Sequence, residues 1–360
     1  MADWSNLPEE LLFSIAVQLF SVVELQRFRS ICRSWRSSVS GNNNLFPNRP
    51  LILINLTQWF GFVNLFLSRA AFFRVALSSS PSQGWLIKSD MDINSRKFRL
   101  IDQFSRLPMR YFLPGVNLLK FTFSEIGETY ELQDRHTRDT FLSRKVVLVK
   151  VVEGEAQHNN ILGLSRQGKI THWDGNNWRK LTKMDLKTDH TFFCDHFSDI
   201  IVHKGLTYAL DTRGTVWWIS SGLEICMYVG LPLGDNISLP EDKSFVECRG
   251  ELYIVDRLRE RKPYVYVPNP KTTDFKIYKF DEELGKMIEV QSLGDNAFVM
   301  ATDTSFSVLA QEYYGCLQNS IYFKDAEEDQ MKVFKLENGS ITTMSQPPQS
   351  CFQMFVPTFL

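Results

Sequence analysis

The densest group of potential metal ligands in the sequence is HTFFCDH, residues 190–196. It contains His190, Cys194, Asp195 and His196. Zinc sites use Cys and His ligands at a few characteristic spacings, and this spacing matches none of them. We therefore interpret the segment as a polar loop, and we expect no metal site and no cofactor.

The common motifs of hydrolytic and phosphate-binding sites are missing from the sequence, namely G-x-S-x-G, the P-loop and H-E-x-x-H. Three aspartates do recur after short apolar runs, at Asp211, Asp256 and Asp303. Because Asp side chains commonly cap turns, we interpret them as turn residues and predict no catalytic residue. A hydrolase or glycan-binding enzyme, with the N-terminal residues as an intramolecular lid, stays open as the alternative, because carboxylates can converge in space without any sequence motif.

Two segments gather side chains suited to recognising another protein. One runs from His172 to Trp178 and the other from Asp256 to Lys262, and both read as turns between strands. Aromatic and Arg side chains dominate protein interfaces, and loops vary freely on a rigid scaffold. The predicted substrate-binding residues are His172, Trp173, Asn176, Trp178, Arg257 and Arg259. The competing interpretation is that both segments are polar connectors.

The overall composition is that of a folded protein. The chain has 360 residues, 44% hydrophobic and 22% charged, with a formal net charge of −1. These values lie outside the disordered range, and the near-neutral charge argues against general nucleic-acid binding.

The cysteines and the first residues indicate a reducing compartment. None of the six cysteines lies in a C-x-x-C pair, and most lie in apolar strand-like runs. The first ten residues, MADWSNLPEE, have neither the basic region nor the apolar core of a signal peptide. We expect the protein in the nucleus, the cytoplasm or both.

One uncharged segment, residues 51–68, is long enough to begin a membrane span. It contains two Asn, one Gln, one Thr and one Gly, and Arg69 and Arg74 follow it closely. We therefore predict two strands around the QWFG turn, with a membrane helix as the alternative.

The first forty residues predict a helical hairpin with two apolar faces. Pro8 and two glutamates suit a helix start, and apolar residues then recur at spacings of three and four. Ser21 and Glu24 form an S-x-x-E capping box, which predicts a second helix with its own apolar stripe ending near Trp35. Forty residues cannot bury this much apolar surface alone. The helices must therefore cover the rest of the chain as a lid, or dock on a partner.

The string LPEELL, followed by VVELQRFRSICRSWRS, resembles the F-box family. That family has a Leu-Pro start and a terminal pattern like V-C-R/K-x-W-R, and this chain departs only by Ile31. The resemblance covers about residues 4–39 and implies binding to a SKP-type adaptor of a cullin-RING ubiquitin ligase. The adaptor-binding residues that it implies are Leu7, Pro8, Leu11, Ile15, Leu25, Phe28, Ile31, Cys32 and Trp35.

After a Gly, Asn and Pro-rich linker at residues 41–50, short strand-like runs alternate with turns. GLTYALD at 205–211 resembles GELYIVD at 250–256, and residues 296–303 form a looser third copy. A repeat of about 40–50 residues built from short strands indicates the blades of a β-propeller. Residues 51–360 would supply about six or seven blades, with a pair of β-sandwiches as the alternative.

Four further strings resemble plant F-box proteins described as kelch-like or SKP-interacting. They are GWLIKSD, NLLKFTFSEIGETYEL, SLGDNAFVMATDTSFSV and GCLQNSIYFKD, in the family's order along nearly the whole chain. The resemblance implies a small all-α F-box at residues 1–40 and a large all-β substrate-recognition domain at residues 51–360. It also implies a non-catalytic receptor subunit of an SCF-type E3 ubiquitin ligase, with an unknown protein substrate.

Overall fold

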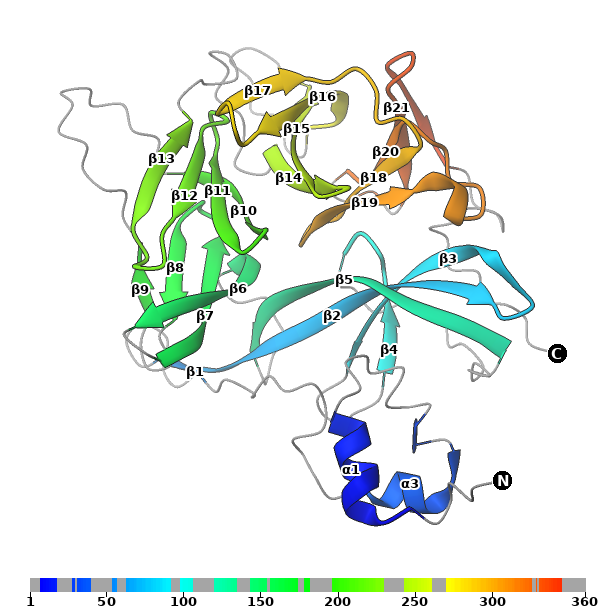
Figure 1. The fold of residues 1–360 in the computed structure, drawn as a ribbon. Helices are drawn as coiled ribbons and strands as arrows, with labels where there is room; N and C mark the ends of the chain where they lie inside the picture. Colours follow the sequence, from blue (N-terminus) through cyan, green and yellow to red (C-terminus); the bar gives the residue numbers. More distant parts are fainter. Residues whose placement is uncertain are drawn as a thin grey trace.

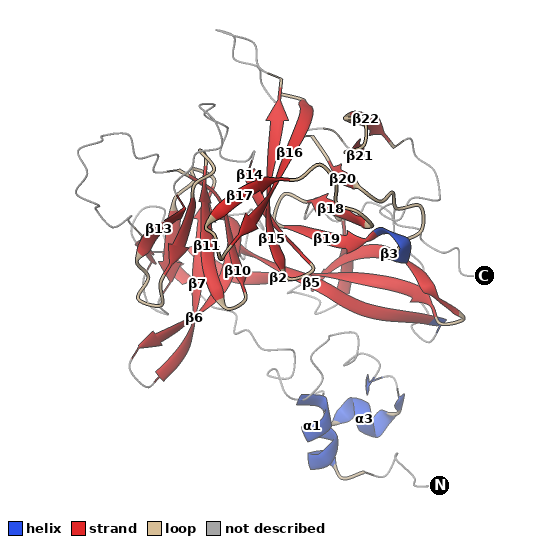
Figure 2. Cartoon of the chain, turned by 45° about the horizontal axis from the view of Figure 1, so that its top comes forward, coloured by secondary structure: helices blue, strands red, loops and turns tan. Residues whose placement is uncertain are grey.

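The structure is a computed structural model that describes residues 7–17, 28–29, 31–39, 54–56, 63–91, 98–105, 120–134, 143–153, 156–173, 178–181, 196–229, 243–260, 270–325, 328 and 330–344. Within these ranges the α-helices lie at the N-terminal end, and strands that are mostly antiparallel follow (Figures 1 and 2).

Helix α1, Glu9–Val17, begins where the sequence predicts. The carbonyl of Pro8 accepts hydrogen bonds from the backbone N–H groups of Leu11 and Leu12, both at 3.1 Å. Glu9 and Glu10 occupy the first turn, where their carboxylates favour the positive end of the helix dipole.

The expected second helix is interrupted. Cys32 has an extended backbone, with φ −158° and ψ 178°, and it is the N-cap residue of the short helix α3, Arg33–Ser37. The interruption turns the chain so that Trp35 lies against Phe28, with ring centroids 4.5 Å apart. The predicted continuous stripe is therefore broken at Cys32, and the capping box lies outside the described residues.

The strands form four sheets, of nine, four, four and five strands (Figure 1). We divide the nine-stranded sheet where its fifth and sixth strands share a single paired position, and so describe five groups of strands, which we call blades 1 to 5. Blade 1 contains β1 Ile54–Leu56, β2 Val63–Leu77, β3 Ser80–Met91, β4 Phe98–Ile101 and β5 Phe121–Asp134. Blade 2 contains β6 Ser143–Glu153, β7 Ala156–Ser165, β8 Ile170–Trp173 and β9 Trp178–Lys180. Blades 1 and 2 share one paired position, Tyr130 opposite Val146, so we describe them separately.

Blades 3 and 4 are simple up-and-down sheets. Blade 3 contains β10 Phe197–His203, β11 Leu206–Asp211, β12 Val216–Ile219 and β13 Ile225–Val229. Blade 4 contains β14 Lys243–Cys248, β15 Glu251–Arg259, β16 Thr272–Asp281 and β17 Lys286–Glu289.

Blade 5 differs because two of its strands pair in parallel. It contains β18 Asn296–Met300, β19 Ser305–Leu309, β20 Ser320–Phe323, β21 Lys332–Lys335 and β22 Ser340–Thr343, with the 3₁₀ turn η3 Ala310–Glu312. Its order is β19-β18-β20-β21-β22, and β18 is parallel to β20.

The predicted strand pair in residues 51–68 is confirmed where the structure describes it. Strands β1 and β2 are antiparallel, with Leu56 opposite Val63, and the QWFG turn lies outside the described residues. None of the helices in the described part of the chain is long and apolar enough to cross a membrane.

The five blades form a ring that closes between blades 1 and 5 (Figure 1). Phe72 of β2 and Leu86 of β3 share a buried cluster with Val299 of β18 and Tyr322 of β20. Gly84 of β3 also forms a parallel bridge with Tyr313. This contact brings the early and late strands together, as in a β-propeller.

The described strands divide into five blades, and the predicted count of six or seven stays a prediction, because further segments lie outside the described residues. Blade 1 uses residues 54–134, because β2 and β5 are 15 and 14 residues long. A period of about 45 residues is therefore shorter than the stretch of sequence that a blade with long strands occupies. The predicted closing strand at residues 352–356 lies outside the described residues.

The repeat is visible in the turns that start β11 and β15. Lys204 and Gly205 have positive φ, as do Arg249 and Gly250, which is the conformation of a tight hairpin turn. Asn319, with φ 52°, directly precedes the corresponding strand of blade 5, β20. Residues 319–325 therefore match the other two copies better than residues 296–303, of which 296–300 form the differently paired β18.

Candidate functional site

The N-terminal helices have a small apolar core of their own. Leu12, Ala16, Phe28 and Val39 are buried against one another, and Leu7, Phe13 and Trp35 pack around them. All seven residues belong to the helical segment itself. In Figures 1 and 2 this segment lies outside the ring of strands. The described core therefore does not depend on contacts with the propeller, as a lid would.

Three large aliphatic side chains stay exposed beside this core. Leu11 is 52% exposed, Ile15 is 38% exposed and Ile31 is 57% exposed. Leu11 and Ile15 are four residues apart on α1, so they lie on one face of the helix. A group of exposed aliphatic side chains on so small a unit is typical of a protein interaction site.

The structure divides the predicted adaptor-binding residues into two groups. Leu11, Ile15 and Ile31 are exposed and available for contact. The other described members are Leu7, Pro8, Phe28, Cys32 and Trp35, of which Phe28 is buried, Pro8 is exposed and the rest are half-buried. Phe28, with Leu7 and Trp35 around it, supports the surface from below. Leu25 lies outside the described residues.

The first predicted substrate-binding segment contains a strand pair. His172 and Trp173 belong to β8 and are 5% and 6% exposed, and Trp178 begins β9 opposite Trp173. The loop prediction is wrong at these positions, because their backbone pairs within blade 2. Asn176 lies outside the described residues. Whether the segment binds a substrate stays a prediction.

The second segment is also a strand where it is described. Arg257 and Arg259 belong to β15, which pairs with β16, so the expected loop is wrong for residues 256–259. Arg257 donates to Thr272 Oγ1 at 2.6 Å and to Asp325 Oδ1 at 2.6 Å. Its guanidinium lies 4.9 Å from the centroid of the Phe323 ring. These contacts give Arg257 a role inside the fold, and substrate binding by either arginine stays a prediction.

The recurring aspartates have two different roles. Asp211 Oδ1 accepts hydrogen bonds from the backbone N–H groups of Arg213 and Thr215, so the turn interpretation is confirmed there. The turn interpretation is incomplete for Asp256 and Asp303, because their carboxylates form ion pairs with buried lysines.

Lys243 Nζ lies 3.0 Å from Asp256 Oδ1, and Lys88 Nζ lies 2.8 Å from Asp303 Oδ1. Both lysine side chains are fully buried. The signal in the sequence was a lysine inside an apolar strand, as in GWLIKSD around Lys88.

Buried carboxylates also join neighbouring blades. Asp199 of β10 receives Lys145 Nζ of β6 at 2.7 Å, and its other oxygen accepts the backbone N–H of Phe245 in β14 at 2.8 Å. One side chain therefore connects blades 2, 3 and 4.

Asp325 connects blades 4 and 5 in the same manner. Burial alone would raise the pKa of Asp325, but hydrogen bonds from Lys332 and Thr272 and the charge of Arg257 lower its pKa below the ordinary value. These buried carboxylates therefore form ion pairs and hydrogen bonds with cations and hydrogen-bond donors of the fold itself.

Within the described ranges, no group of three or more His, Cys, Asp or Glu side chains could hold a metal ion. His196 is described, and its Nδ1 lies 2.7 Å from the carbonyl oxygen of Gln167. The remaining members of the HTFFCDH group lie outside the described residues. The four described cysteines, Cys32, Cys226, Cys248 and Cys316, are free thiols.

A self-contained helical unit with an exposed aliphatic face, followed by a ring of β-sheets, defines a class of protein: a docking module attached to a propeller. Comparison with known families agrees with both parts. Residues 4–46 match the F-box-like family, and residues 64–335 match the family described as KIB1-4 beta-propeller.

Similar curated proteins come from Arabidopsis thaliana. The putative F-box protein At1g65770 is 52% identical, the probable F-box protein At1g65740 is 49% identical and the F-box protein At2g17690 is 43% identical, each over 100% of both chains. The chain belongs to the KIB1-4 beta-propeller family of F-box proteins. The kelch-like part of the earlier resemblance is not confirmed.

Proposed function

We propose that this chain is the substrate-recognition subunit of an SCF-type E3 ubiquitin ligase. The helical segment binds a SKP-type adaptor, and the adaptor connects the chain to a cullin-RING ligase. The propeller binds a target protein and presents it for ubiquitination. The chain acts without a cofactor, in the nucleus, the cytoplasm or both.

The observation that carries this proposal is the exposure of Leu11, Ile15 and Ile31 on a unit whose described residues have an apolar core of their own. An intramolecular lid would bury such side chains against its own chain. A partner with an apolar surface would remove them from water, at about 25 cal/mol for each Å² buried.

The contacts of the buried acids support a receptor over an enzyme. A hydrolytic site needs carboxylates that are available to substrate in a pocket. Asp199, Asp256, Asp303 and Asp325 instead form ion pairs with lysines or arginines of the fold. The ubiquitin chemistry belongs to the partner enzymes of the complex.

The test is a double substitution, Leu11→Asp with Ile15→Asp, in the full chain. Each change places a carboxylate at a solvent-exposed position and leaves the core around Leu12 intact. We expect the affinity for a purified SKP-type adaptor to fall by at least about thirtyfold, because desolvating an unpaired carboxylate in an interface is costly.

The matched control is Ile126→Asp, because Ile126 is an exposed isoleucine on β5, 37% exposed. This variant should bind the adaptor as the unmodified protein does. Equal adaptor affinities for the double variant and the control would contradict the proposal.

A further inference from the structure

The exposed apolar side chains of the propeller are unevenly distributed. Eight large hydrophobic residues of its described part are exposed, and six of them belong to blades 3 and 4. The eight are Ile126, Val202, Leu206, Met227, Tyr228, Leu284, Ile288 and Leu317. Single exposed apolar residues are ordinary, but a concentration on two neighbouring blades indicates an interaction surface.

Three of the six belong to the segments that meet where the turn between β16 and β17 contacts blade 3. Leu206, Tyr228 and Leu284 are 45%, 42% and 64% exposed. Glu282 of this turn bonds to three residues of blade 3, so we call this surface the Glu282 junction. Its members are Lys204, Leu206, Tyr208, Tyr228, Glu282 and Leu284.

Glu282 fixes the turn of blade 4 to blade 3 through three hydrogen bonds. Lys204 Nζ donates to Oε2 at 2.8 Å, and Tyr208 Oη donates to Oε1 at 3.1 Å. Tyr228 Oη donates to the backbone carbonyl oxygen of Glu282 at 3.0 Å. Leu206 lies between Lys204 and Tyr208 in the chain, and Leu284 lies two residues after Glu282, so the backbone of each continues directly from a residue of this network.

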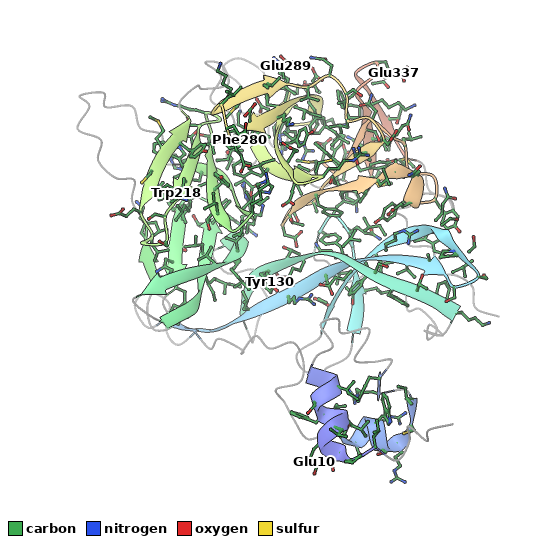
Figure 3. All side chains as sticks on the ribbon, in the orientation of Figure 1. Glu10, Tyr130, Trp218, Phe280, Glu289 and Glu337 are labelled. Carbon is green, nitrogen blue, oxygen red and sulfur yellow. The ribbon has the colours of Figure 1, made fainter. Side chains whose placement is uncertain are left out.

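An aromatic layer supports the junction from below. The rings of Tyr208, Tyr228 and Phe280 pack edge to face (Phe280 is labelled in Figure 3). The ring centroids are 5.9 Å apart for Tyr208 and Tyr228, 6.1 Å for Tyr208 and Phe280, and 5.6 Å for Tyr228 and Phe280. Asp281 Oδ1 accepts the backbone N–H groups of Glu283 and Leu284, which holds the turn. The surface is therefore ordered before any partner arrives, which lowers the entropic cost of binding.

The charge around the junction is negative. Residues 281–286, DEELGK, carry three carboxylates and one lysine. The nearby Lys204 and Lys279 are each paired with a carboxylate, Glu282 and Glu251 respectively. Hydrogen bonds from Lys204 and Tyr208 outweigh the effect of burial and lower the pKa of Glu282, so its carboxylate stays ionised near neutral pH. Exposed Glu283 adds an acid beside Leu284.

We infer that the Glu282 junction is the docking site for a target segment that combines Lys or Arg with aliphatic or aromatic side chains. The apolar residues of the segment would contact Leu206, Tyr228 and Leu284, and its cations would face the acids of the turn. This complementarity of charge favours a basic partner over an acidic one. The inference rests on the proposed function, because it assumes that the propeller binds a target protein.

The test is a selection from a random peptide library displayed on phage, with the full-length protein as bait. The same library is applied to a double variant, Leu206→Asp with Leu284→Asp, and to a control variant, Ile126→Asp with Leu317→Asp. Both variants exchange two exposed apolar residues for carboxylates. Melting temperatures equal to that of the unmodified protein establish that each variant is folded.

We expect the enriched peptides to contain Lys or Arg near Leu, Ile, Phe, Trp or Tyr. A synthetic peptide with the enriched sequence should bind the control variant normally and the Leu206→Asp, Leu284→Asp variant at least about tenfold more weakly. Its binding should also weaken for Glu283→Lys and at high salt, because ion screening and charge reversal remove the electrostatic attraction.

Three results would overturn the inference: no enrichment, enrichment of acidic or uncharged peptides, or unchanged peptide binding by the double variant. The adaptor affinity of the same variants separates this inference from the proposed function. Normal adaptor binding without basic-peptide enrichment refutes the docking site alone. Peptide enrichment on a protein that does not bind the adaptor refutes the ligase role instead.

Discussion

At the scale of single residues, charged groups hold the propeller together from inside. The pair between Lys145 and Asp199 joins blades 2 and 3, and its two side chains are 11% and 5% exposed. Removing one member of a buried pair leaves the other without compensation for its lost hydration, so such pairs are sensitive to truncation.

We predict that Lys145→Ala lowers the free energy of unfolding by about 3–5 kcal/mol, because Asp199 keeps its burial and loses its cation. Urea unfolding followed by tryptophan fluorescence measures this change. The control is Lys271→Ala, because the Lys271 side chain is 69% exposed in its pair with Glu328 and its loss should matter by less than about 1 kcal/mol. Equal effects of the two substitutions would show that burial of the pair is unimportant.

The carboxyl group of Asp325 predicts a dependence of stability on pH. Its pKa is lower in the folded protein than in the unfolded chain, so its ionised form stabilises the fold above the unfolded pKa. This contribution should be lost as the pH falls below about 4 and through the folded pKa. Asp325→Asn should therefore show a shallower fall in melting temperature over that range. A fall as steep as that of the unmodified protein would contradict this role.

At the scale of elements, the sequence predicted the type of structure better than its boundaries. The apolar spacing and Pro8 placed α1, and the strand-and-turn texture predicted an all-β remainder. The break at Cys32 was missed because local helix spacing continues across it. Residues 256–259 were misassigned because alternating charges resemble a loop, whereas Arg257 pairs with Asp325, a residue far away in sequence.

The independence of the helical segment leads to a prediction. Leu7 packs on the core of the segment, and Pro8 accepts the first hydrogen bonds of α1. The double change Leu7→Ala with Pro8→Ala should weaken adaptor binding at least about tenfold. The melting temperature of the propeller should stay the same, because its described core clusters contain none of these residues. If the double change lowers both the adaptor affinity and the melting temperature, the result would instead favour a lid that packs on its own chain.

At the scale of the whole molecule, the sequence predicted a ring of blades but not how the strands pair within each blade. The repeats at 205–211 and 250–256 indicated blades, and the structure confirms those two strands. The parallel pairing in blade 5 and the long strands of blade 1 could not be predicted, because neither follows from a regular period. The adaptor-binding residues on the helices were likewise predicted as one apolar set. Their division into exposed and buried side chains could not be predicted, because burial depends on three-dimensional packing.

The proposed receptor has two separate surfaces, one on the helices and one on the propeller. The surfaces lie on different parts of the chain, so a change at one should leave binding at the other intact. That separation is what a protein needs in order to hold an adaptor and a target at the same time.

The central claim is that the helical segment binds a SKP-type adaptor. Its most direct test is isothermal titration calorimetry of the full-length protein with the purified adaptor at several temperatures. We predict a one-to-one complex with a dissociation constant below about 1 μM and a negative heat-capacity change, because the exposed aliphatic side chains of the helices leave water on binding. No complex at adaptor concentrations of about 10 μM, or binding without a heat-capacity change, would contradict the account.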